Sequence, residues 1–356
     1  MTPVCIITGF LGSGKTTLIN HILTYRAFRN SLVIINEFGE IGIDHLLVSS
    51  PLENVYLLAN GCICCKVRGD MVETLTDIIR KRASGGIPSF DRVFIETTGL
   101  ADPVPIVQTI VSDYELSPFF SLDAVIGVID AVHAGPQLAG HYEARKQVAI
   151  SDVLLLSKSD LVSAVDLADL EPAIRRINRG APLIRSQHGR VPPPLLFGYG
   201  DVARRRIVDL QRWLERGPQA EQAAGDSHAS KLHADGIQSF SVFHAGCATK
   251  AGLAAWLSML ASFKGPQLLR VKGIVNVGGR PFVVHAVQSV IHDPVELEVW
   301  PDADQRTRVV FITRNMGREV IERSFEIFEI ADTFRDARGI DPEAYARFRR
   351  AAINLL

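Results

Sequence analysis

Two short segments of this sequence carry residues whose types and spacing could do chemistry: a glycine-rich run and a group of three cysteines. The glycine-rich run, GFLGSGKT at residues 9–16, fits the pattern GxxxxGK[ST]. An apolar run before it and apolar residues at helical spacing after it predict a strand, a loop and a helix. Such a loop turns backbone N–H groups toward phosphate oxygens, and the helix adds its positive end. The motif and the strand–loop–helix context that it needs occur together here, whereas an incidental glycine turn would not need that context.

This loop predicts a nucleotide site. Lys15 is expected to reach the β and γ phosphates, and the Thr16 hydroxyl to ligate Mg²⁺. The predicted phosphate-binding residues are Gly9, Gly12, Ser13, Gly14, Lys15, Thr16 and Thr17.

A second strand is predicted at residues 92–96, and it ends in an acidic side chain followed by TTGLADP. We predict that Glu96 holds Mg²⁺, directly or through water, and forms the catalytic set with Lys15 and Thr16. Gly99 would let the following loop sense a γ-phosphate. The alternative is that Glu96 only ends a strand.

The sequence SKSD at residues 157–160 follows a predicted buried strand. It is similar to NKxD, the motif with which GTPases recognise guanine. The aspartate of that motif accepts hydrogen bonds from the guanine N1–H and exocyclic amine, and adenine cannot donate this pair of bonds. We predict that Lys158 and Asp160 bind guanine. Ser157 replaces the asparagine, which leaves the strength of discrimination against adenine open, and Ser186 is expected to offer a backbone N–H to the base. A plain turn at the end of a strand is the alternative.

Three of the five cysteines, Cys62, Cys64 and Cys65, lie between a predicted strand and a predicted helix. A nearby helix amino terminus and basic neighbours lower a thiol pKa, and three soft donors suit Zn²⁺, Co²⁺ or Cu⁺. Three ligands leave one tetrahedral corner for an outside ligand. A redox role for the adjacent pair is the main alternative. The lone Cys5 and Cys247 are expected to be small buried residues.

The segment NEFGEIGID at residues 36–44 is acidic, contains glycine and follows a predicted strand. In P-loop GTPases, a segment at this place in the chain forms a mobile switch whose order depends on the γ-phosphate. Glu37 and Glu40 are candidates for the missing metal ligand or for a contact to Mg²⁺. An ordinary surface loop is equally compatible with this composition.

The composition limits the classes of function. Of 356 residues, 47% are hydrophobic and 22% are charged, and the formal net charge of −1 favours neither nucleic acid nor an anionic membrane. No apolar stretch is long enough to cross a bilayer, and the amino terminus runs directly into a strand-like segment, so we expect a cytoplasmic protein. In a reducing compartment a cysteine cluster favours metal or redox chemistry over disulfides.

Strands and helices alternate through the first part of the chain, and the length predicts two domains. The expected fold is an α/β P-loop NTPase with a mostly parallel sheet flanked by helices, plus a smaller α+β domain. The predicted boundaries are 1–216 for the nucleotide domain, 217–235 for a linker, 236–330 for the second domain and 331–356 for a helical tail. In the second domain we expect strands at 268–277, 282–290 and 309–313, and helices at 250–263 and 317–328.

Together, GFLGSGKTT, NEFGEIGID, NGCICC, ETTGLADP and SKSDL resemble the CobW-like GTPases, and LLRVKGIVNVGGRPFVVHAVQ resembles their carboxy-terminal domain. The resemblance implies a GTP- and Mg²⁺-dependent metallochaperone that binds zinc or cobalt at Cys62, Cys64 and Cys65. The expected partners are GTP and a client metalloenzyme, with a homodimer left open. Two alternatives remain: a dedicated activator that inserts cobalt or iron into one enzyme, and a nucleotide-binding regulator with a structural zinc site.

Overall fold

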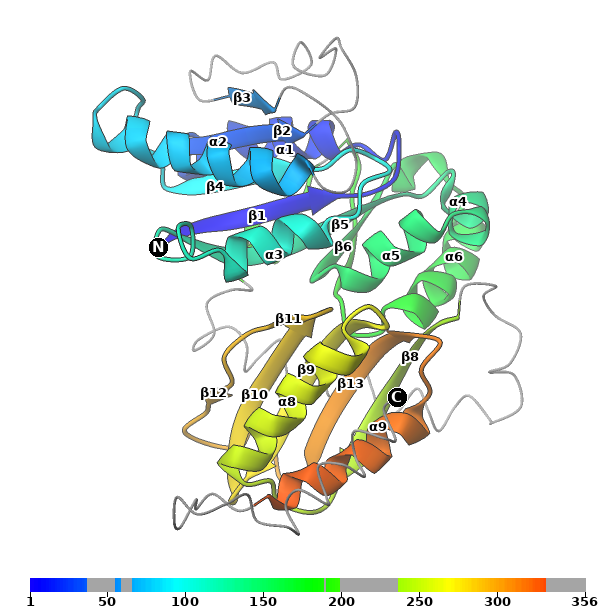
Figure 1. Ribbon diagram of the computed structural model, residues 1–356. Coiled ribbons are helices and arrows are strands. Elements are labelled where there is room, and N and C mark those ends of the chain that lie inside the picture. The colour runs from blue at the N-terminus through cyan, green and yellow to red at the C-terminus, as the bar shows by residue number, and fades with distance from the viewer. Residues whose placement is uncertain (37–54, 59–65, 189, 199–235, 331–356) are drawn as a thin grey trace. The chain divides into compact units, whose positions relative to one another are not determined.

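The computed structural model of the protein describes residues 1–36, 55–58, 66–188, 190–198 and 236–330 (Figure 1). The chain divides into two compact units, the first within residues 1–201 and the second holding residues 236–330. Of the predicted segments, the linker, the tail, Glu37, Glu40 and the three clustered cysteines lie outside the described residues. No helix in the described part is both long and apolar enough to cross a membrane.

The first unit is built on a seven-stranded sheet in the order β3-β2-β4-β1-β5-β6-β7, with every neighbouring pair parallel. Its strands are β1 Thr2–Thr8, β2 Ser31–Asn36, β3 Val55–Leu58, β4 Arg92–Glu96, β5 Phe120–Asp130, β6 Val153–Ser157 and β7 Leu183–Arg185. Its α-helices are α1 Lys15–Thr24, α2 Lys66–Ala83, α3 Val104–Ser112, α4 Ala134–Gly140, α5 Tyr142–Ile150 and α6 Ala164–Ile177. The predicted α/β class and parallel sheet are confirmed.

The strands of this sheet carry apolar residues on both sides, and such strands are stable only where both faces of the sheet are covered. Cys5 and Ile7 of β1 pack with Leu18 and Ile22 of α1 in one buried cluster. Alternate residues of a strand point to opposite faces, and α2 and α3 lie in front of the strands in Figure 1. Because all seven strands run parallel, their carboxyl ends lie at one edge of the sheet, where connecting loops can form a site.

The second unit is an antiparallel sheet in the order β11-β10-β9-β13-β8, with β12 paired to β10. Its elements are β8 Ile237–His244, α8 Lys250–Lys264, β9 Leu268–Val277, β10 Arg280–Val287, β11 Val290–Ile291, β12 Val295–Glu296, β13 Thr307–Arg314 and α9 Arg318–Ser324. Figure 1 shows α8 and α9 against one face of this sheet, where Trp256 and Phe311 are buried. The predicted α+β domain is confirmed.

Three local expectations in this unit are wrong. The strand expected at 282–290 ends at Val287, where Gln288 has a left-handed backbone with φ of +51°. The chain turns back there, and Val290–Ile291 forms a separate strand that pairs antiparallel with the end of β10. The helix expected at 317–328 changes to a 3₁₀ helix at Phe325–Glu329. Cys247 is exposed rather than buried, since it lies in the connection between β8 and α8. Cys5 is buried as expected.

Candidate functional site

The glycine-rich loop connects β1 to α1 at the carboxyl edge of the parallel sheet. Gly9, Gly12 and Gly14 have φ values of +148°, +71° and +93°, a backbone region that L residues with a side chain rarely adopt. Gly9 is also constrained by space, since a Cβ there would lie 2.2 Å from the Val128 carbonyl oxygen. The loop conformation therefore depends on its glycines.

The lysine and threonine that begin α1 point into this loop region. The Lys15 ammonium donates to the carbonyl oxygens of Gly9 at 3.0 Å and Phe10 at 3.3 Å, so it lies within the curl of the loop. The Thr16 hydroxyl donates to Glu96 Oε1 at 2.9 Å. Thr17, the last predicted member, lies exposed on α1. The structure thus brings predicted residues of two elements together: Lys15 and Thr16 at the start of α1, and Glu96 at the end of β4.

The TTGLADP segment after β4 packs directly against the glycine-rich loop. A Cβ on Gly99 would lie 2.6 Å from the Leu11 backbone nitrogen, so only glycine fits without moving the loop. Gln147 of α5 donates to the carbonyl oxygens of Gly99 at 3.2 Å and Ala101 at 3.1 Å. Lys146, also on α5, forms an ion pair with Asp102 at 2.6 Å. Helix α5 therefore holds this segment in place beside the loop.

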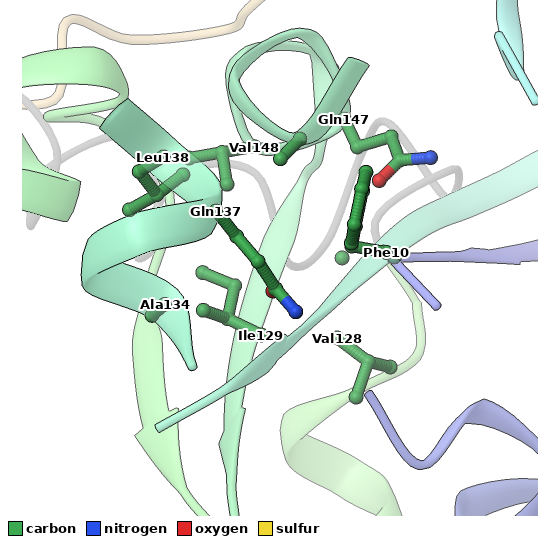
Figure 2. Close-up of a pocket in the computed structure, with 11 residues that line it drawn as sticks. Phe10, Val128, Ile129, Ala134, Gln137, Leu138, Gln147 and Val148 are labelled. Carbon is green, nitrogen blue, oxygen red and sulfur yellow. The ribbon is translucent and has the colours of Figure 1, made fainter. Parts of the chain in front are cut away.

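Phe10, the aromatic residue of the glycine-rich loop, packs among residues of β5, α4 and α5. Figure 2 shows Phe10 lining a small pocket with Leu138, Gln147 and other side chains of β5, α4 and α5. The Phe10 and His141 ring centroids are 4.7 Å apart. Because the N-cap of α5 contacts Phe10 and the helix itself contacts the 99–102 segment, α5 connects the two loops. No sequence pattern indicated this connection.

The SKSD segment ends β6 and reaches the same loop. The Ser157 hydroxyl donates to the Ser13 carbonyl oxygen at 2.6 Å, so the serine that replaces asparagine connects this strand to the loop. The Lys158 ammonium donates to the Gly12 carbonyl oxygen at 2.9 Å. Asp160 lies in the next 3₁₀ turn, 3.8 Å from His188 Nε2. The Ser186 N–H was expected to face the base, and this prediction is wrong. That N–H donates to the Leu156 carbonyl oxygen within the sheet.

One acidic residue at this edge was not singled out by the sequence analysis. Asp130 ends β5, and its carboxylate accepts from Lys158 at 2.7 Å, His133 Nδ1 at 2.9 Å and the Val132 N–H at 2.9 Å. Burial alone would raise the pKa of Asp130, but these hydrogen bonds, led by the one from Lys158, outweigh it and hold the pKa below its ordinary value. The available signal was an acidic residue at the end of an apolar strand, the same signal that identified Glu96.

Residues 3–185 match the family model described as the CobW/HypB/UreG nucleotide-binding domain. The chain belongs to this family. Residues 237–329 match a second model, described as the cobalamin synthesis protein CobW carboxy-terminal domain.

Its relatives include proteins of known structure. Over 199 residues the chain is 40% identical to the zinc chaperone YjiA of Escherichia coli, an alignment that covers 55% of this chain and 62% of YjiA. Over 343 residues it is 28% identical to the zinc chaperone CobW of a Sinorhizobium species, covering 87% and 92% of the two chains. The structure of Zn(II)-bound YjiA GTPase from E. coli matches with a TM-score of 0.69 and 27% identity, over 92% of this chain and 98% of that one.

Proposed function

We propose that this protein is a GTPase that couples its nucleotide state to the binding of a transition metal and its transfer to a client metalloenzyme. Zn²⁺ is the leading candidate for the metal, followed by Co²⁺. The observation that carries the GTPase part is the 2.9 Å hydrogen bond between the Thr16 hydroxyl and the Glu96 carboxylate, beside Lys15. Membership of the CobW/HypB/UreG family and the resemblance to the YjiA GTPase support it.

The donor set at this edge fits Mg²⁺ and a nucleoside triphosphate. A hydroxyl and a carboxylate are oxygen ligands of the kind that Mg²⁺ prefers, so Thr16 and Glu96 would hold the ion. When bound, Mg²⁺ neutralises charge that develops on the transferred phosphate. Lys15 would donate to phosphate oxygens from its place in the loop, together with backbone N–H groups of residues 9–17. Gly99 would position the following segment near the γ-phosphate.

Guanine recognition is assigned to the SKSD segment. Asp160 would accept from guanine, and Lys158 would keep that segment against the glycine-rich loop through its bond to the Gly12 carbonyl oxygen. Ser157 supplies a further bond to the loop but has only one donor, where asparagine has two.

For the metal we propose Cys62, Cys64 and Cys65 as ligands, with Glu37 or Glu40 completing the site or contacting Mg²⁺. These residues lie outside the described part, but the sheet supports a connection with the nucleotide site. Strands β2 and β3 run parallel to β4, so their carboxyl ends lie at the same edge as Glu96. The acidic segment and the cysteine segment follow those two strands in the chain. The names zinc chaperone and zinc-regulated GTPase metalloprotein activator, given to relatives, favour zinc.

We assign residues 1–216 to the nucleotide domain, 217–235 to a linker, 236–330 to the second domain and 331–356 to a helical tail. A cytoplasmic location and a homodimer are part of the same proposal.

The coupling of metal to nucleotide is tested by Zn²⁺ competition against a chromophoric chelator, using the full chain with Mg²⁺ and either GDP or a non-hydrolysable GTP analogue. The Kd for Zn²⁺ should differ by at least about tenfold between the two states, because a nucleotide can shift metal binding only by its differential affinity. Equal Kd values would rule out the coupling. The GTPase activity is tested separately by a GTP hydrolysis assay of Glu96→Gln. We expect this variant to lose most of the hydrolysis rate.

The location of the metal is tested with matched cysteine variants. Cys64→Ala with Cys65→Ala should abolish tight Zn²⁺ binding and leave GDP affinity largely unchanged. Cys247→Ala is the control, because that exposed thiol lies in the second unit. If the double variant instead unfolds, a structural zinc site replaces the proposed transferable one.

A further inference from the structure

Asp130 is a buried acidic residue at the nucleotide edge to which no sequence motif assigns a role. Its side chain is only 2% exposed, and both carboxylate oxygens accept hydrogen bonds. One oxygen accepts from the Val132 N–H, and the other from Lys158 and His133. A carboxylate fixed by three donors has one orientation, so it can act as a rigid support for a neighbouring side chain.

Lys158 is the neighbour that needs such support. Its backbone is left-handed, with φ of +55° and ψ of +28°, a conformation that is unfavourable for a residue with a side chain. Its ammonium bridges the Asp130 carboxylate and the Gly12 carbonyl oxygen, at 2.7 and 2.9 Å. These two bonds join the end of β5 and the start of the 3₁₀ turn to the glycine-rich loop.

Ser157 makes this bridge more important. Its hydroxyl has one proton and two acceptors within reach, the carbonyl oxygens of Ser13 at 2.6 Å and Ile129 at 3.1 Å. An asparagine amide would offer two donors for the same connections. Lys158 therefore supplies a second side-chain connection between the end of β6 and the loop, and Asp130 holds it in place.

We propose that Asp130 is a positioning residue for guanine recognition, which holds Lys158 on the glycine-rich loop and thereby fixes the place of Asp160 two residues later. This inference rests on the proposed guanine-nucleotide site. Asp130 acts through Lys158 and does not itself contact the base. The exposed His133 shares the same carboxylate oxygen and contributes a second donor from the side facing solvent.

A double-mutant cycle on the full chain tests this role, with fluorescent mant-GDP and mant-ADP as probes in the presence of Mg²⁺. Asp130→Asn removes the charge-assisted bond and should raise the Kd for mant-GDP about tenfold. Lys158→Gln should have a similar effect. Because Asp130 acts through Lys158, adding Asp130→Asn to Lys158→Gln should cause less than about a twofold further loss.

The ratio of the mant-ADP Kd to the mant-GDP Kd distinguishes base positioning from a general loss of structure. Asp130→Asn should lower this ratio, because adenine does not use Asp160. Glu171→Gln is the matched control: Glu171 pairs with Arg185 at 2.7 Å in the same unit, but both side chains are substantially exposed, so both Kd values should stay within about twofold. If Asp130→Asn does not fold, Asp130→Glu replaces it, since a carboxylate displaced by one methylene should also weaken mant-GDP binding through Lys158.

Three results would overturn the positioning role: an unchanged mant-GDP Kd, equal losses for both nucleotides, or losses that multiply in the double variant. The proposed function is judged separately on the unmodified protein. If that protein does not prefer mant-GDP over mant-ADP, the guanine site itself is wrong and the positioning role falls with it. If it does prefer mant-GDP while Asp130→Asn behaves like the unmodified protein, only the positioning role is wrong.

Discussion

The two ends of strand β5 each carry a buried aspartate that pairs with a basic side chain, and the two pairs have different surroundings. Asp123, near the amino end, pairs with Arg92 and also accepts from the Gly198 N–H at 3.0 Å. The Arg92 guanidinium lies 5.0 Å from the Phe197 ring centroid. Asp130, at the carboxyl end, pairs with Lys158 beside the glycine-rich loop.

The surroundings of the Asp123 pair are those of a core. Cys5 lies fully buried against both partners, and burial, followed by the nearby Asp123 charge, raises the pKa of its thiol well above the ordinary value. The Asp130 pair instead abuts a loop whose backbone can receive phosphate. In a parallel sheet, loops and helix amino termini gather at the carboxyl edge. We therefore propose that the same kind of ion pair serves stability at the amino end of β5 and ligand binding at the carboxyl end.

The largest expected effect is on stability, at the amino end. Asp123→Ala leaves the Arg92 guanidinium, only 20% exposed, without its carboxylate, and should lower the free energy of unfolding by about 3 kcal/mol. Denaturant unfolding followed by circular dichroism measures this. Glu171→Ala, at an exposed pair, should cost less than about 1 kcal/mol. A weaker mant-GDP affinity in folded Asp123→Ala would break the division between the two ends.

A smaller effect, at the carboxyl edge, should appear in nucleotide binding. Gly99→Ala places a Cβ within 2.7 Å of the Leu11 backbone, which cannot move without shifting the glycine-rich loop. Overpacking usually costs about 1–3 kcal/mol, and here the strain falls on the glycine-rich loop. We therefore expect the free energy of GTP binding to weaken by a similar amount, about 2 kcal/mol. Gly135→Ala is the control, because the Cβ there meets open space at the start of α4. Equal GTP affinities for the two variants would show that the 99–102 segment does not act on the loop.

Much of this edge was predictable from local sequence. The strand that ends at Glu96 has the predicted bounds because an apolar run stops at one acidic residue. The glycine-rich loop was recognised because glycines at fixed spacing are required for its positive φ angles. Ser157 was noticed only as a departure from NKxD, since its bond to Ser13 joins residues 144 positions apart.

The contacts that were not predicted depend on packing between distant elements. Gln147 bonds to Gly99 across 48 positions, and no periodicity in α5 indicates that its amide faces that loop. Cys247 was expected to be buried from the average behaviour of cysteine, whereas its exposure depends on its place in a connection between elements. The helix that changes to 3₁₀ at Phe325 keeps its large apolar side chains buried, which apolar spacing alone does not distinguish from a continuous α-helix.

The smallest effect expected is a pH dependence specific to Asp130. Hydrogen bonds hold its pKa in the folded state below the ordinary value, so its carboxylate stabilises the fold fully above the unfolded-state pKa of about 4. That contribution is lost as the pH falls through the folded-state pKa. The difference in unfolding free energy between the unmodified protein and Asp130→Asn should therefore be constant near neutral pH and shrink below about pH 4. Denaturant unfolding by circular dichroism between pH 2.5 and 7, with Glu171→Gln as control, measures it. A difference that grows on acidification would mean that burial, and not the bond from Lys158, dominates at this end of β5.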